Sequence, residues 1–215
     1  MSATPRLTPI GAAEIDAVRE YFVGLHTRLS DAWAALDPDS AQRRDQWTRP
    51  AGDVLAGSGR LSLIENGQVF DRAGVAFSDV SGARLPAAAS ERHTELAGQP
   101  FRAMGTSVVV HPVNPYAPTS HANVRLFTAL GGEVWWFGGG FDLTPYYGFE
   151  DDARHWHRTA RDAIVQIHRE YIAAGVDIIE TNTFNSQAVS LADYHMGSLG
   201  YELSKAGAEC AKRAV

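Results

Sequence analysis

Four polar residues that could together bind a carboxylate lie close to one another in the sequence. Alternation along a strand expected at 104–111 puts Ser107 and His111 on one face. The same count puts Asn123 and Arg125 on one face of the next expected strand. An arginine offers a carboxylate two parallel hydrogen bonds, and a histidine transfers protons near neutral pH. Neighbouring strands would bring these side chains together as a site for a carboxylate-bearing ligand.

A glycine-rich segment further along the chain adds an acidic residue to this set. Gly138–Gly140 lack side chains where we expect the backbone to bend or to approach a ligand closely. Asp142 follows among aromatic residues, so we expect a partly desolvated carboxylate that seeks a cationic or N–H partner. With His121, which follows a proline-rich loop, it suits a flat, nitrogen-bearing ligand. The glycine run lacks the GxGxxG pattern and following helix of a dinucleotide site.

Each of these residues also has a purely structural interpretation. A single histidine such as His111 or His121 is more often hydrogen-bonded within a fold than catalytic. His155 and His157 lie two residues apart in an expected helix, where side chains diverge by about 200°, unlike the spacing of a helical metal site. No GxSxG motif surrounds Ser107, which argues against a nucleophilic serine. A function therefore requires the whole set to converge.

The elements that would position these residues indicate an α+β fold. Apolar residues at steps of three and four predict a helix over 12–36, ended by Pro38, with His26 at its surface or rim. Asn66-Gly67 predicts a hairpin between two strands. Further strands are expected at 75–77, 104–111, 123–129 and 133–137. Since no helices separate them, residues 1–163 should form an antiparallel sheet flanked by helices.

The end of the chain has a different pattern. Acidic residues followed by helical periodicity predict a helix from 150 to about 175. A β-branched run predicts a strand at 176–180, and residues 186–215 are typical of a helix whose apolar stripe includes Cys210. Residues 164–215 are therefore expected to form a separate helix–strand–helix segment.

Composition excludes several classes of protein. The 215 residues carry a net charge of −6, which argues against nucleic-acid binding or a membrane-surface role. Cys210 is the single cysteine, so an intramolecular disulfide and a four-thiolate zinc site are excluded. No apolar run reaches the roughly 18 residues of a spanning helix, and the N-terminus lacks the pattern of a secretion signal. We expect a cytoplasmic protein.

Two long motifs resemble those of oxygen-dependent coproporphyrinogen III oxidases. They are HPVNPYAPTSHANVR and WWFGGGFDLTPYYGFEDDARHWHRTARD, and WTRP at Trp47–Pro50 and FDRAGVAFSDV at Phe70–Val80 also match. The resemblance covers residues 1–163. It implies oxidative decarboxylation of two propionates of coproporphyrinogen III to vinyl groups, giving protoporphyrinogen IX. It further implies molecular oxygen as the oxidant, no flavin or haem, and a homodimer.

The resemblance also implies roles for individual residues. Ser107, Asn123, Val124, Arg125 and Asp142 match substrate-binding positions, with Arg125 on a propionate and Asp142 on pyrrole N–H groups. His121, Asp142 and Arg125 match catalytic positions, and His121 matches the proton donor. His111, His121 and His157 match ligands of a divalent metal.

The remainder of the chain resembles a different family. The stretch IVQIHREYIAAGVDIIETNTFNSQAVSLADY and LSKAGAECAKRAV are similar to an early part of the homocysteine methyltransferase module of cobalamin-dependent methionine synthase. The sequence is thus interpreted as a chimera: an incomplete oxidase-like domain at 1–163 joined to a fragment at 164–215. Two alternatives to oxidase activity stay open, a porphyrinogen-binding but inactive fragment and a homocysteine S-methyltransferase.

Overall fold

The computed structural model describes residues 8–85, 96–173 and 197–215. Two compact units divide the chain, at residues 1–147 and 148–215. The elements of the first unit are α1 (Ala12–Leu36), β1 (Ala41–Arg49), β2 (Ala56–Glu65), β3 (Phe70–Gly82), β4 (Phe101–Pro112), β5 (Thr119–Ala129), the 3-10 turn η3 (Leu130–Gly132) and β6 (Val134–Thr144). Those of the second are α2 (Glu150–Ala173), the 3-10 turn η4 (Gly197–Leu199) and α4 (Gly200–Ala214).

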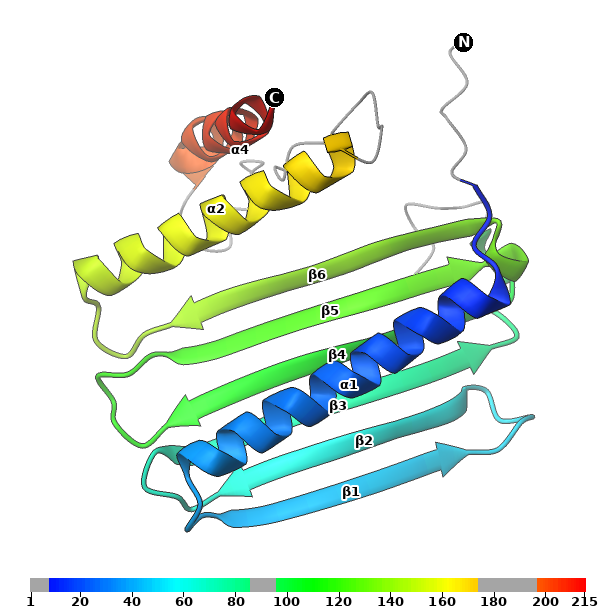
Figure 1. The fold of residues 1–215 in the computed structure, drawn as a ribbon, viewed down its shortest axis with the longest axis horizontal. Helices are drawn as coiled ribbons and strands as arrows, with labels where there is room; N and C mark the ends of the chain where they lie inside the picture. Colours follow the sequence, from blue (N-terminus) through cyan, green and yellow to red (C-terminus); the bar gives the residue numbers. More distant parts are fainter. Residues whose placement is uncertain (1–7, 86–95, 174–196) are drawn as a thin grey trace. The chain divides into compact units, whose positions relative to one another are not determined.

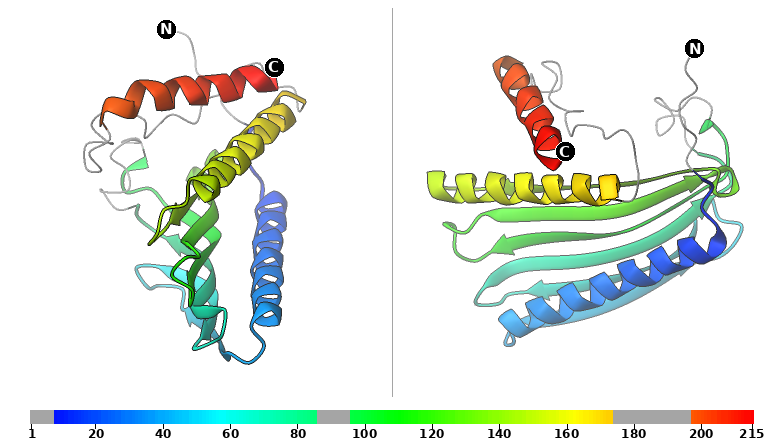
Figure 2. Two further views of the ribbon diagram at one scale, coloured as in Figure 1. Left: turned by 90° about the vertical axis from the view of Figure 1, so that its left-hand side faces the viewer. Right: turned by 45° about the horizontal axis from the view of Figure 1, so that its top comes forward.

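The first unit is an antiparallel sheet whose strands follow one another in chain order, β1 to β6 (Figure 1). Every neighbouring pair is antiparallel. Helix α1 lies along one face of the sheet, as the left view of Figure 2 shows. The predicted α+β class and the antiparallel sheet are confirmed. Such sequential pairing needs only short connections, which is why no crossover helices separate the strands.

Helix α1 is fixed to the sheet by an apolar contact and by an ionic one. Phe22 packs with Phe77 of β3 and Met104 of β4 in a buried cluster. Beside it, the Nε atom of Arg19 donates a hydrogen bond of 2.9 Å to the buried carboxylate of Asp79. Because the apolar contact is sealed by a charge pair that must be met in a defined geometry, α1 has one preferred position on the sheet.

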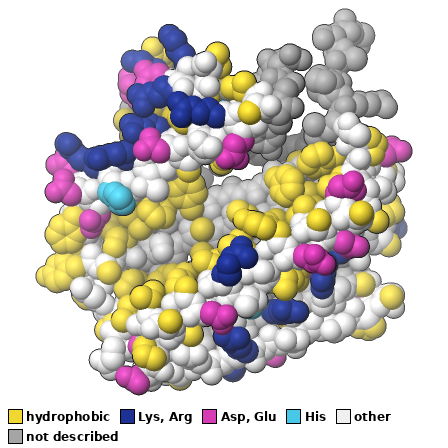
Figure 3. Space-filling model, in the orientation of Figure 1, with side chains coloured by type: hydrophobic (Ala, Val, Ile, Leu, Met, Phe, Trp, Pro, Cys, Tyr) yellow, Lys and Arg dark blue, Asp and Glu magenta, His cyan; other side chains and the backbone are white. Residues whose placement is uncertain are grey.

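The prediction that His26 lies at the surface is wrong. The buried stripe of α1 consists of Phe22, His26 and Ser30, spaced four residues apart, and His26 is 6% exposed. The helix is therefore rotated relative to the expected apolar face. Part of that face instead lines an open groove of about 480 Å³ beside the sheet, in the region where Figure 3 shows hydrophobic side chains next to α1. The groove is lined by Ala17, Val18, Tyr21, Phe22, Leu25, Val124 and Phe137.

The predicted hairpin is confirmed and is tied to the end of α1. Asn66 adopts φ of 56°, the left-handed conformation that such a turn requires. The carboxylate of Asp37, just past the end of α1, accepts hydrogen bonds from the backbone N–H groups of residues 68, 69 and 70. Any side chain at Gly67 would collide with this carboxylate, since an added Cβ would lie 1.9 Å from Oδ2 of Asp37. The turn thus needs glycine for space.

Strand β1 was not predicted from the sequence. Its residues are polar and almost all exposed, so they lack the apolar alternation of a half-buried strand. Pairing along its whole length with β2 forms the strand. Trp47 lies opposite Gly59 in this register, and an added Cβ at Gly59 would lie 2.4 Å from the indole. The glycine therefore makes room for the one large side chain of this edge strand.

In the second unit, α2 is a continuous helix from Glu150 to Ala173 that packs against α4. Val165 of α2 and Cys210 of α4 are buried, and the predicted place of Cys210 on the inner stripe of a helix is confirmed. The strand predicted at 176–180 and the helix predicted at 186–196 lie outside the described residues. Among the described residues, no helix is both long and apolar enough to cross a membrane.

Candidate functional site

The face of the sheet opposite α1 collects the polar residues that sequence analysis singled out. Residues paired across β4, β5 and β6 share a face, because directly opposed residues point to the same side. Phe77, Met104 and Leu126 are on the α1 side. The alternate positions of the same strands bring five predicted residues onto the other side: Ser107, His121, Asn123, Arg125 and Asp142.

Arg125 lies between two glycines on the neighbouring strands. In the register of the sheet it is opposed by Gly105 of β4 and Gly138 of β6. An added Cβ at Gly138 would lie 2.9 Å from Nε of Arg125, and one at Gly105 would lie 3.0 Å from its Cβ. The absence of side chains on both sides lets the long arginine side chain lie along the sheet. Sequence analysis did not identify Gly105, although a glycine inside a strand is a known sign of close approach.

The expected bend at Gly138–Gly140 is not present. Strand β6 continues through all three glycines and keeps its register with β5. The close approach comes from the neighbouring strand instead, because a Cβ at Gly139 would lie 2.6 Å from the carbonyl oxygen of Asn123. At Gly140 an added Cβ would meet nothing within 4 Å, so space is open above that position.

Asn123 occupies the middle row of the site, between Ser107 of β4 and Gly140 of β6. Its side-chain oxygen Oδ1 is buried and has no hydrogen-bond partner among the described residues. An unpaired buried acceptor costs about 1–3 kcal/mol, so a ligand that donates an N–H or O–H group there would recover that energy. The row thus offers an acceptor of the kind that a nitrogen-bearing ligand needs.

His121 and Asp142 form a pair across β5 and β6. Nδ1 of His121 and Oδ2 of Asp142 are 2.9 Å apart. The expectation that aromatic neighbours desolvate Asp142 is wrong, since 56% of its side chain is exposed. The physical reason is alternation: Phe141 and Leu143 flank Asp142 in the chain but point to the opposite face. The predicted cationic or N–H partner is the imidazole, which the carboxylate orients as in many acid–base pairs.

Three other predicted residues lie apart from this group. His111 shares the face, near the end of β4, and its Nδ1 is 3.4 Å from Oγ1 of Thr119. Val124 follows Asn123 in the strand, so its side chain points to the α1 side, where it lines the apolar groove. His157 is an exposed residue of α2, in the second unit.

A hollow of about 300 Å³ lies over the strands that carry the group. That volume is at the lower end of small-molecule sites, enough for one part of a large ligand. The hollow is lined by Ser78, Val80, Ala103, Met104, Gly105, Thr106, Ser107, His121, Asn123, Val124 and Arg125. It therefore combines a cation, an unpaired acceptor and an imidazole.

The donor set was also tested against a divalent metal. Among residues 8–85, 96–173 and 197–215, no group of three or more His, Cys, Asp or Glu side chains could hold a metal ion. Metal centres in proteins generally use three or four protein ligands, whereas His121 and Asp142 supply two. The described residues do not fit a resident metal, and no step below passes through one.

Comparison with known families agrees with this site. A family model described as coproporphyrinogen III oxidase matches residues 17–176. The match includes α1, all six strands with the polar group, and α2. Because it spans well over half of the chain, the chain belongs to the coproporphyrinogen III oxidase family.

Proposed function

We propose that this protein decarboxylates propionate side chains of coproporphyrinogen III oxidatively, with molecular oxygen as the oxidant. Family membership supports an oxidoreductase of porphyrin biosynthesis that acts on a porphyrinogen. In each turnover a propionate would lose its carboxyl group as CO₂ and one hydrogen from the ring-proximal carbon, leaving a vinyl group. The two electrons and two protons released would reduce O₂ to H₂O₂, which balances the reaction.

The observation that supports this proposal most is the convergence of complementary groups on one open face. We assign Arg125 to a propionate carboxylate, which its guanidinium can grip with two parallel hydrogen bonds. Asp142 and the unpaired Oδ1 of Asn123 are acceptors for pyrrole N–H groups. We assign proton transfer to His121, held by Asp142 at 2.9 Å, and a polar contact with the substrate to Ser107.

Three roles implied by the resemblance rest on the resemblance alone. They are substrate contact by the backbone of Val124, divalent metal binding by His111, His121 and His157, and assembly as a homodimer. Cytoplasmic location likewise stays a prediction.

Turnover and substrate binding should be measured separately. Purified protein incubated with coproporphyrinogen III in air should yield vinyl-bearing product, detected after oxidation by chromatography with fluorescence, and the reaction under nitrogen should yield none. Arg125→Ala should weaken binding of a non-reactive porphyrin tetracarboxylate at least about tenfold. Arg43→Ala, which removes an arginine from the exposed strand β1, is the matched control.

The outcomes separate the alternatives. Folded protein that forms no vinyl product but binds the porphyrin through Arg125 would be a binding module and would exclude the oxidase. Absence of both turnover and Arg125-dependent binding would exclude both. Methyl transfer by the C-terminal segment would require homocysteine-dependent methylation, which the same preparation can be assayed for.

A further inference from the structure

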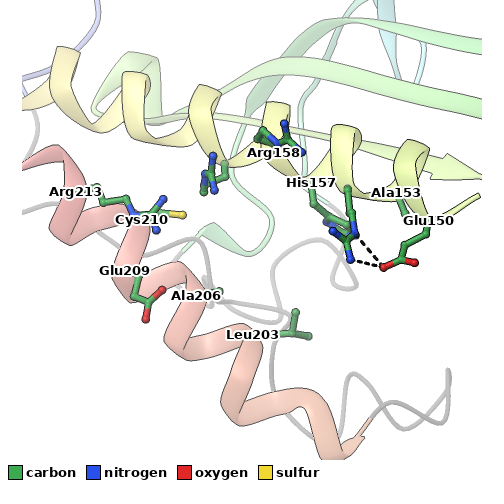
Figure 4. A pocket seen from close by; sticks show the side chains of 11 residues that line it. Glu150, Ala153, His157, Arg158, Leu203, Ala206, Glu209, Cys210 and Arg213 are labelled. Atoms are coloured by element: carbon green, nitrogen blue, oxygen red, sulfur yellow. Dashed lines mark hydrogen bonds and ion pairs between the residues drawn. The ribbon is translucent and has the colours of Figure 1, made fainter.

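The second unit contains a basic groove between two helices. Its volume is about 760 Å³, within the range of small-molecule sites. Figure 4 shows its walls: one face of α2 on one side and one face of α4 on the other. The groove is lined by Glu150, Ala153, Arg154, His157, Arg158, Arg161, Leu203, Ala206, Glu209, Cys210 and Arg213.

The charge of this lining is opposite to that of the whole chain. Four arginines face two glutamates, an excess of two positive charges in a protein of net charge −6. On α2 the arginines recur at steps of four and three residues, which places them in one row along the helix. The stems of these side chains also give the groove apolar walls, and charge interactions are stronger where water is partly displaced.

Two of the four guanidinium groups are available to a ligand. Arg154 is paired with Glu150 one turn earlier, and Arg161 is paired with Asp162 at 2.9 Å. Among the described residues, neither Arg158 nor Arg213 has an ion-pair or hydrogen-bond partner for its guanidinium. These two groups come from opposite walls of the groove, one from α2 and one from α4 (Figure 4).

The two helices hold these groups at a defined separation. The Nη2 atom of Arg169 of α2 donates a hydrogen bond of 3.2 Å to the backbone oxygen of Arg213 at the end of α4. Cys210 is buried one turn before Arg213, where α4 packs on α2. Binding therefore would not have to order a loop before the two guanidinium groups could act together, which favours affinity.

We propose that this groove binds a small molecule with at least two anionic groups, carboxylates or phosphates, gripped by Arg158 and Arg213. A single anionic group could pair with one guanidinium only, whereas a molecule with two could span the groove. This inference depends on the second unit alone and is independent of the chemistry proposed for the sheet.

Isothermal titration of the full chain with pyrophosphate and, separately, with citrate tests the proposal. At low salt we expect saturable one-to-one binding of at least one probe. Arg158→Glu and Arg213→Glu should each weaken it at least about tenfold. Arg43→Glu makes the same charge change on β1 and should alter it less than about twofold. Binding of pyrophosphate alone would identify a phosphate ligand, and binding of citrate alone a carboxylate ligand.

Two results would overturn the proposal. One is the absence of saturable binding of either probe below about 1 mM, since weaker binding is what any exposed basic patch gives. The other is an Arg43→Glu variant that loses as much affinity as Arg158→Glu, which would mean non-specific attraction. Circular dichroism checks that α2 and α4 stay helical, and where a Glu variant unfolds, the Lys variants at both positions replace it and should lose the bidentate part of the affinity.

Discussion

The two faces of the sheet are made by alternate residues of the same strands, yet they do different work. On the α1 side, Phe77 and Leu126 are at most 2% exposed and form the core. On the other side, Asn123, Arg125 and Asp142 are polar and leave a hollow. A fold can thus confine its stabilising contacts to one face and leave the other free for binding, because side chains at successive positions point in opposite directions.

The largest effect on stability is expected from Phe77→Ala. The ring is 2% exposed and packs with Phe22, Met104 and Leu126, so its removal leaves a cavity. We expect a loss of about 3–5 kcal/mol in the free energy of unfolding, measured by urea denaturation. A loss below about 1 kcal/mol would mean that α1 does not seal this face, and the contrast between the faces would fail.

A smaller loss, about 2–3 kcal/mol, is expected from Asp79→Ala on the same face. Its carboxylate binds Arg19 of α1 and, through two bonds of 2.8 Å, Arg102 of β4. Removing it leaves both cations without their partner, although each keeps some contact with water. Denaturation of Asp79→Ala and of Arg19→Ala measures this, and equal stability of Asp79→Ala and wild type would contradict it.

The same carboxylate should make stability depend on acid. Burial of Asp79 raises its pKa, but the hydrogen bonds and charges of Arg102 and Arg19 outweigh burial and hold the pKa below its ordinary value of 3.8. A lowered carboxyl pKa gives stability that is present above pH 4 and is lost as the pH falls through the folded-state value. The difference in stability between wild type and Asp79→Ala should therefore narrow below pH 4.

His26 predicts a pH effect in a different range. Burial lowers the pKa of His26 below 6.5, with Arg60 and Arg44 adding to the shift, while Asp31 and the nearby Val75 backbone oppose it. Neither imidazole nitrogen meets hydrogen-bond geometry with a described residue. A lowered histidine pKa means that its contribution is complete above pH 6.5 and is lost as the pH falls toward the folded-state value.

Unfolding of wild type and of His26→Gln at pH 7.5 and pH 5.5 measures this contribution. We expect wild type to lose more stability than the variant between the two pH values. An equal loss in both proteins would show that another group is responsible, and would place His26 outside the tightly packed face.

The smallest effect on stability is expected from Asp142→Asn, on the open face. The pair with His121 is largely exposed, so we expect a change below about 1 kcal/mol in the free energy of unfolding. Porphyrinogen turnover should nevertheless fall sharply, because the amide no longer orients the imidazole as a carboxylate does. A large loss of stability together with intact turnover would reverse the functional contrast between the faces.

The sequence by itself determined which residues share a strand face. Alternation at Ser107 and His111, and at Asn123 and Arg125, needs only the two-residue period of a strand. The Asn66-Gly67 turn and the end of α1 near Pro38 were also local in origin, since a left-handed residue and a fixed proline φ depend on one or two positions.

Only the tertiary structure decided how those faces were completed. Strand β1 exists because β2 pairs with it, His26 is buried because α1 docks in one rotation, and Asp142 is exposed because its aromatic neighbours face α1. The pairing of His121 with Asp142 and the placing of Arg125 between Gly105 and Gly138 depend on the register of β4, β5 and β6. Register and docking arise from contacts between residues distant in the chain, which local periodicity does not contain.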